Sequence, residues 1–338
     1  MHNLKLLSKE KRTHLYQQMD KHKRFIIPAL MILLLALPYL LNSQYIMRII
    51  IMICVYSILG MSLGLITGYA GQTSLGHAAF YAIGAYTSAI ISVNYGISFF
   101  ITAPIAAAVA ALMGFLLGLP TLRLSGTYLA ITTLGFAEVV RMIFLNWERV
   151  TNGPLGISRI PRPTFMGIEL TIANNGMYYL VLALLLLTTL IMHFIVKSKF
   201  GRALTAIRDD EVAAVMMGVR ITHYKIVAFV VGAFFAGLAG AFYAHLIRFI
   251  DPNTFTFDTS ILILSIVILG GMGTIKGMFL GALLLISFPE LLRFVQEYRF
   301  VMYGLILVLM MRFRPQGLLG GQQKTDYAFP KGMKVDRQ

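Results

Sequence analysis

A short polar stretch set among glycines contains the residue types in this sequence that are best suited to chemistry. Gln72, Thr73, Ser74 and His77 lie within six positions of one another in otherwise apolar sequence. The glycines around them are Gly60, Gly64, Gly68, Gly71 and Gly76. Non-helical backbone at membrane depth is tolerated where it lines a cavity or is buried in protein, so the stretch favours a cavity-lining or re-entrant segment. The alternative is that the glycines allow helices to pack closely.

A second glycine cluster lies nearer the C-terminus and has fewer polar companions. Its members are Gly270, Gly271, Gly273, Gly277 and Gly281. Helix packing and a cavity-lining role explain this cluster equally well.

Carboxylates are scarce within the apolar runs. Glu138 and Glu290 are each followed three residues later by an arginine, Arg141 and Arg293. Side chains at this spacing lie on one face of a helix and form ion pairs. Both pairs lie toward the outer ends of their runs, which favours a structural role. An ion-coupled transporter would normally need carboxylates deeper in the bundle.

Motifs of enzymes that work on nucleotides, metals or esters are absent from the sequence. It contains no G-x-x-x-x-G-K-[ST], no H-E-x-x-H and no G-x-S-x-G. The seven histidines are scattered, and Cys54 is the single cysteine. We therefore predict a non-enzymatic protein with no catalytic residues, no metal site and no cofactor.

The composition is that of a chain whose solvent is lipid. Of the 338 residues, 58% are hydrophobic and 13% are charged, and the mean hydropathy is +0.76. Soluble domains carry about a quarter charged residues. The net charge of +15 comes mostly from Lys and Arg between the apolar runs and at both tails. This distribution indicates cytoplasmic loops and tails, and it argues against nucleic acid as a partner.

About ten apolar runs are candidates to cross the roughly 30 Å hydrocarbon core of a bilayer. They cover 25–41, 46–67, 77–94, 99–118, 126–146, 177–196, 226–248, 259–274, 277–295 and 298–313. We predict an all-α, polytopic transmembrane helical bundle at 25–320, between a basic cytoplasmic tail at 1–24 and a second cytoplasmic tail at 321–338. The first run is followed by no A-x-A cleavage signal, so we interpret it as a retained span.

Charge favours an even number of spans with both termini in the cytoplasm. With the first tail inside, the inner loops hold most of the basic residues. These are Arg123, Lys197, Lys199, Arg202, Arg208, Arg220, Lys225 and Lys276, followed in the last tail by Arg312, Arg314, Lys331 and Lys334. The outer loop 147–176 is the exception, with Arg149, Arg159 and Arg162.

The longest cytoplasmic loop, 197–225, predicts a helix from Arg202 to Met217 that Gly218 ends. Its charges are interleaved with a small apolar face made of Ala203, Ala206, Ala213 and Ala214. Such a helix either offers a surface to a soluble partner or is an amphipathic connector at the lipid interface.

Several segments resemble known transport proteins. Asp210-Glu211-Val-Ala213-Ala214-x-x-x-Gly218 resembles the E-A-A-x-x-x-G coupling motif of ABC importer permeases, with one residue more than usual before the alanine pair. Over about residues 45–320 the chain is similar to the branched-chain amino acid permease family, best to its M-type subunit. The segments that carry this similarity are GLITGYAGQTSLGHAAFYAIGAY (64–86), GTYLAITTLGFAEVVR (126–141), TNGPLGI (151–157), GRALTAIRDDEVAAVMMGV (201–219), LGGMGTIKGMFLGA (269–282) and RPQGLLG (314–320).

The resemblance implies a subunit of a prokaryotic plasma-membrane importer for leucine, isoleucine or valine, in which other chains hydrolyse ATP. The implied partners are a related second permease in a heterodimer, two cytoplasmic ATP-binding subunits and an extracytoplasmic solute-binding protein. Residues implied in ATPase coupling are Arg208, Asp210, Glu211, Ala213, Ala214 and Gly218. Residues implied in the translocation path are Gly71, Gln72, Ser74, Gly76 and His77.

Other functions remain as alternatives at this point. Related importers carry urea or short amides, and specificity in this class resides largely in the binding protein. An ion-coupled secondary transporter is disfavoured by the scarcity of carboxylates within the runs, and a membrane enzyme by the absence of catalytic motifs.

Overall fold

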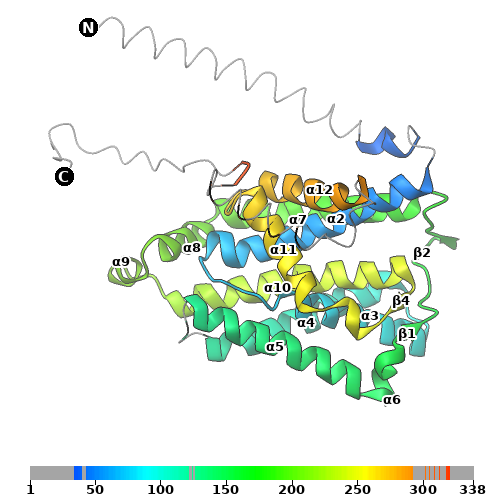
Figure 1. Ribbon diagram of the computed structural model, residues 1–338, viewed down its shortest axis with the longest axis horizontal. Coiled ribbons are helices and arrows are strands. Elements are labelled where there is room, and N and C mark those ends of the chain that lie inside the picture. Colours follow the sequence, from blue (N-terminus) through cyan, green and yellow to red (C-terminus); the bar gives the residue numbers. More distant parts are fainter. Residues whose placement is uncertain are drawn as a thin grey trace, which may run out of the picture.

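Eight long helices form a bundle in the part of the chain that the structure describes (Figure 1). This computed structural model describes residues 34–39, 43–121, 124, 126–291, 301, 304, 308, 312 and 317–319. The long helices are α2 (Gln44–Gly64), α3 (His77–Tyr95), α4 (Phe99–Thr121), α5 (Gly126–Asn146), α7 (Gly176–Lys197), α10 (Ile221–Ile247), α11 (Phe257–Gly270) and α12 (Ile275–Leu291). The predicted tails and most of the first and last spans lie outside the described residues.

Short elements gather at the two ends of the bundle. The helical ones are η1, a π-helix (Leu65–Tyr69), α6 (Glu148–Thr151), η2 (Gly153–Leu155), α8 (Lys199–Asp209), α9 (Glu211–Met216) and η3 (Pro252–Thr254). Strand β1 (Ile157–Ser158) pairs antiparallel with β4 (Phe249–Ile250), and β2 (Thr164–Phe165) pairs antiparallel with β3 (Ile168–Glu169). Figure 1 shows α8 and α9 at one end, and the strands with α6 at the other.

Six helical segments among the described residues are long and apolar enough to cross a membrane. They are Gln44–Tyr69, Phe99–Leu119, Gly126–Asn146, Gly176–Lys197, Ile221–Ile247 and Pro252–Gly270. A shorter apolar helix covers Ile275–Phe288, and α3 is helical over 19 residues without being among the six. The predicted all-α transmembrane bundle is thus confirmed, whereas ten spans and the placement of the termini stay predictions.

Helix α10 lies in the core, where it packs against α2, α3 and α4. Glycines make this close packing possible. A Cβ on Gly240 would strike the backbone carbonyl of Tyr81 in α3, and one on Gly232 would lie 2.7 Å from the side chain of Ile66. Small residues let helix backbones approach each other in membranes, where no hydrophobic force drives helices together.

The packing interpretation of the glycine clusters is confirmed for some of their members, while a cavity-lining role stays a prediction. Gly60 and Gly64 in α2 leave room for Ile266 and Met278, and Gly281 leaves room for the carbonyl of Ile266, so these serve packing. Other glycines instead end helices. The chain is non-helical over 70–76 and again over 271–274, and the positive-φ glycines in these two breaks are Gly71 (φ 67°), Gly271 (φ 111°) and Gly273 (φ 84°).

Three predicted boundaries are wrong. The loop helix predicted for 202–217 is two helices, α8 and α9, because Asp210 is extended (φ −160°) and its carboxylate accepts hydrogen bonds from the first-turn backbone N–H groups of α9. Helix α10 begins at Ile221, five residues before the predicted span at 226. Helix α11 ends at Gly270 and not at 274, because Gly271 takes a positive φ.

Candidate functional site

The break between α2 and α3 holds the predicted path residues, of which all but the exposed Gly71 are buried. The π-helix η1 ends α2, and Gly71 then turns the chain with φ 67°. Gln72, Ser74 and His77 are all buried, and the Gln72 backbone N–H donates to the carbonyl of Ile66 at 3.0 Å. The sequence therefore located a true interruption of the helix at which polar side chains enter the core.

Helices α5 and α11 hold this break from two sides. The Leu75 backbone N–H donates to the Thr133 hydroxyl of α5 at 3.0 Å. Gly76 lies so close to Thr133 that a Cβ would strike the Thr133 carbonyl. The Ala78 backbone N–H donates to the Ser260 hydroxyl of α11 at 3.1 Å. Side chains thus supply acceptors at the start of α3, where backbone N–H groups have no partner within the helix.

His77 makes one polar contact inside the bundle. Its Nε2 lies 2.6 Å from the Ser62 hydroxyl, which itself donates to the carbonyl of Leu59 at 2.7 Å. Nδ1, the other ring nitrogen, is buried and has no hydrogen-bond partner.

Unpartnered polar atoms are concentrated in this region. Among the described residues, five buried side-chain atoms lack a hydrogen-bond partner: Thr67 Oγ1, Ser74 Oγ, His77 Nδ1, Tyr81 OH and Tyr86 OH. All five belong to residues 67–86. Buried polar groups in proteins are nearly always paired, and leaving one unpaired costs about 1–3 kcal/mol. Several such atoms in one stretch of chain are expected where water or a polar solute is the partner.

Sequence reasoning missed Thr67, Tyr81 and Tyr86. The two tyrosines lie in an aromatic cluster around Phe255, whose ring centroid is 5.1 Å from that of Tyr81 and 6.1 Å from that of Tyr86. The Tyr86 ring also stacks on Phe144 of α5 at 4.2 Å. A tyrosine in an apolar run is normally interpreted as a core residue. The feature that could have marked these two tyrosines is the hydroxyl group, which usually has a hydrogen-bond partner when it is buried.

Arg208 of the predicted coupling loop contacts both breaks. Its Nη1 donates to the carbonyl of Gly68 at 3.0 Å, while Nε and Nη2 donate to Asp209 Oδ1 at 3.1 and 2.9 Å. A Cβ on Gly71 would lie 2.8 Å from Arg208 Cγ, and one on Gly273 would lie 3.4 Å from Nη1. The structure thus brings a predicted coupling residue against a predicted path residue.

The other predicted coupling residues have different environments. Asp210 caps α9, and Glu211 bonds Lys225 of the same chain at 2.6 Å. Ala213 is exposed whereas Ala214 is buried. Gly218 ends the loop with φ 80°, and no atom lies within 4 Å of the position of its Cβ. No group of three or more His, Cys, Asp or Glu side chains that could hold a metal lies among the described residues.

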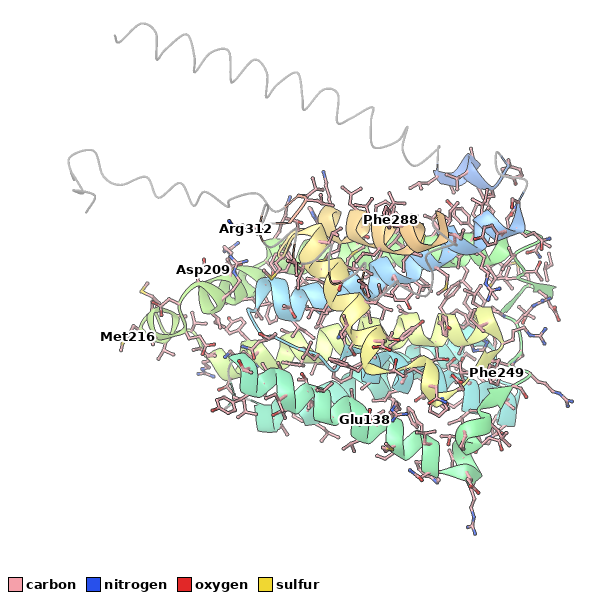
Figure 2. All side chains as sticks on the ribbon, in the orientation of Figure 1. Glu138, Asp209, Met216, Phe249, Phe288 and Arg312 are labelled. Atoms are coloured by element: carbon pink, nitrogen blue, oxygen red, sulfur yellow. The ribbon has the colours of Figure 1, made fainter. Side chains whose placement is uncertain are left out.

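Apolar side chains cover the tip of the loop, which we did not predict. They are Val212, Val215, Met216 and Met217, the last two 80% and 84% exposed. Figure 2 shows Met216 at the end of α9, away from the bundle. Flexible, polarizable methionines are common on protein-binding surfaces.

Comparison with known proteins identifies the family. The model of the branched-chain amino acid transport system / permease component family matches residues 45–311. The chain belongs to this family. It is a multi-pass membrane protein of the permease type, and its helix breaks and loop lie within the matched region.

Curated relatives include bacterial and archaeal permeases. The high-affinity branched-chain amino acid transport system permease protein LivM of Escherichia coli is 41% identical over 321 residues, covering 88% of this chain and 75% of the relative. The probable LivM of Methanocaldococcus jannaschii is 26% identical over 330 residues (82% and 94%). The autoinducer 2 import system permease protein LsrC of Salmonella typhi is 32% identical over 194 residues (54% and 53%). No solved structure matches the chain.

Proposed function

We propose that this chain is the M-type permease subunit of an ATP-driven ABC importer that carries leucine, isoleucine and valine into the cell. The observation that carries this proposal is the 41% identity over 321 residues to a high-affinity branched-chain amino acid permease. The chain works with a related second permease, two cytoplasmic ATP-binding subunits and an extracytoplasmic solute-binding protein. The ATP-binding subunits hydrolyse ATP.

Uptake of labelled leucine tests this proposal directly. Deleting the gene from its native host should abolish high-affinity leucine uptake, and a plasmid copy should restore it. Unlabelled isoleucine and valine should compete with leucine, while urea and acetamide should not. Competition by urea or acetamide alone would assign the subunit to the alternative substrate class. Unchanged uptake of all these solutes in the deletion strain would contradict the proposal.

The chain crosses the membrane ten times, with both termini in the cytoplasm. Support comes from the loops 147–176 and 197–225, which lie at opposite ends of the bundle in Figure 1. Single cysteines replacing the exposed residues Ser158 and Ala206 in a Cys54→Ala background test the orientation. An impermeant thiol reagent added to intact cells should label Ser158→Cys and leave Ala206→Cys unlabelled. In inside-out vesicles the labelling should reverse, and labelling of both from one side would exclude this topology.

The polar stretch at the α2–α3 break lines the translocation path through Gly71, Gln72, Ser74, Gly76 and His77. An amino acid presents an ammonium group, a carboxylate and an apolar side chain. Neutral hydroxyl, amide and imidazole groups can bind both charged ends, whereas a fixed charge would hold one end too tightly for release. The buried unpartnered atoms of residues 67–86 support this assignment, because a passing solute would give them a partner.

The loop formed by α8 and α9 couples this path to the ATP-binding subunits. Its exposed apolar tip, centred on Met216 and Met217, fits a docking surface better than a connector. Gly218 supports the tip with its positive φ of 80°, a conformation that costs a residue with a Cβ about 1 kcal/mol.

Gly218→Ala should therefore weaken the coupling loop without a steric clash. We expect normal insertion of the chain, less ATP-binding subunit in the purified complex, and reduced leucine uptake. Gly96→Ala is the matched control, since Gly96 also has a positive φ (66°) and open space around it but ends α3 in a different loop. Equal losses in the two variants would mean that Gly218 affects stability and not coupling.

A further inference from the structure

Helix α5 has an open face whose exposed residues follow a helix-packing pattern. The stripe consists of Tyr128, Ile131, Gly135, Glu138, Met142 and Asn146. These residues are three or four positions apart, and residues at such spacings lie along one side of a helix, as they do where two helices pack together. Figure 1 shows α5 at one edge of the bundle, and Figure 2 places Glu138 on it.

This face is hollowed at its centre. A Cβ on Gly135 would have no atom within 4 Å. A shallow, open depression of about 560 Å³ lies beside it, and its lining residues all belong to α5: Gly135, Glu138, Val139, Met142, Ile143 and Asn146. A glycine facing open space in a membrane helix is a position at which a second helix can approach closely.

The carboxylate of Glu138 disfavours contact between this face and the lipid tails. Its side chain is 48% exposed. The sequence placed Glu138 toward the outer end of its run, but it lies deeper than that, eight residues from the end of α5 and roughly 12 Å along the helix axis. A carboxylate at this depth is costly in hydrocarbon and is normally found facing protein or water. Arg141 confirms the predicted ion pair: its Nε donates to both carboxylate oxygens at 3.1 and 3.0 Å and its Nη2 donates to Oε1 at 2.5 Å, yet the Glu138 side chain stays 48% exposed.

Helix α7 provides an internal comparison. In both α5 and α7, 28% of the most apolar 18-residue window is buried. The exposed residues of α7 include Leu187, Leu190 and Phe194, and its sequence has no carboxylate. Apolar side chains are exposed on both helices, and the exposed carboxylate of Glu138 is what distinguishes α5. This difference favours lipid against α7 and protein against α5.

We propose that the open stripe of α5 is the surface on which the second permease subunit packs, with a small residue opposite Gly135 and a hydrogen-bond donor or cation opposite Glu138. This inference rests on the importer function proposed above. The other side of α5 touches the candidate path, through the Thr133–Leu75 hydrogen bond and the Phe144–Tyr86 stack. The subunit contact therefore lies one helix away from the break.

Cross-linking in the complete importer tests the assignment. In a Cys54→Ala background, Ile131→Cys on α5 should cross-link to the second permease with a short bifunctional thiol reagent, once single cysteines are scanned along that subunit. Leu190→Cys on α7 should not. A cross-link between two copies of this chain through Ile131→Cys, or a cross-link to the second permease through Leu190→Cys alone, would overturn the proposal.

A large side chain at Gly135 tests the same surface through a second, independent measurement, the yield of the co-purified second permease. Gly135→Leu should lower the yield of co-purified second permease at least tenfold, while Ala183→Leu, at an exposed site on α7, should not. Thermal unfolding of the isolated chain should be similar for both, and equal yields of the second permease would overturn the proposal. Leucine uptake by the wild type separates failure of the proposed α5 surface from failure of the proposed importer function. Normal uptake with a negative cross-link refutes the α5 surface alone, and a wild-type complex without any second permease refutes both.

Discussion

Arg208→Lys should reduce leucine uptake at least tenfold while leaving the complex assembled. The guanidinium donates through Nη1 to the carbonyl of Gly68 and through Nε and Nη2 to Asp209. A planar fork can serve both acceptors at once, whereas a lysine ammonium is a single point of charge on a flexible stem. The variant should keep the positive charge of the loop and lose the link to the break between α2 and α3.

The size of this effect follows from the energy of coupling between two sites. Coupling free energies are typically about 1–3 kcal/mol, which corresponds to a change of roughly 5- to 150-fold. Uptake and binding-protein-stimulated ATP hydrolysis should be measured in the same reconstituted vesicles. Persistent hydrolysis with reduced uptake is the expected result, because the ATP-binding subunits remain docked while their movement no longer reaches the break.

Arg202→Lys is the matched control for this variant. Arg202 lies on the same helix and bonds the carbonyl of Lys197 within the loop, at 3.2 Å. It should retain near-normal uptake. Wild-type uptake by Arg208→Lys, or equal losses in the two variants, would show that the contact with Gly68 is packing without a role in coupling.

Apolar runs predicted the long helices because the bilayer sets their length. The run 126–146 coincides with α5, and the run 177–196 differs from α7 by one residue at each end. Hydropathy predicts which residues lie in the hydrocarbon core, and it does not predict where a hydrogen-bonded helix begins or ends. For this reason α10 begins five residues earlier, at Ile221, where the polar residues 222–225 already continue the helix.

The sequence predicted the part of the candidate site whose residues are close together in the chain. Gly71, Gln72 and Ser74 are neighbours in the chain, so their glycine and polar types reveal a break without any fold. The bond from Arg208 to Gly68 joins residues 140 positions apart, and no pattern in one sequence shows it. Glu211, predicted to couple to the ATPase, has its ion-pair partner Lys225 in this chain. That pairing depends on how α9 lies against α10.

Tyr81→Phe and Tyr86→Phe should slow uptake without destabilising the protein. Both hydroxyls are buried and unpartnered, so removing them relieves a desolvation cost of about 1–3 kcal/mol each. The rings and their contacts with Phe255 remain. If the hydroxyls bind the ammonium or carboxylate of a passing amino acid, each loss should lower leucine uptake several-fold and raise the half-saturating concentration in reconstituted vesicles.

Tyr178→Phe should give the opposite result in the same experiment, a loss of stability with normal uptake. Its hydroxyl donates to the carbonyl of Leu34 at 2.6 Å, so its removal breaks an existing bond. The free energy of unfolding should fall by about 0.5–1.5 kcal/mol, while leucine uptake stays near the wild-type level. Thermal unfolding in detergent and uptake in vesicles, measured for all three variants, separate a stabilising hydroxyl from one kept for transport. Normal uptake by both Tyr81→Phe and Tyr86→Phe would remove these tyrosines from the path, because an unpartnered hydroxyl that contributes neither stability nor transport has no part in carrying the solute.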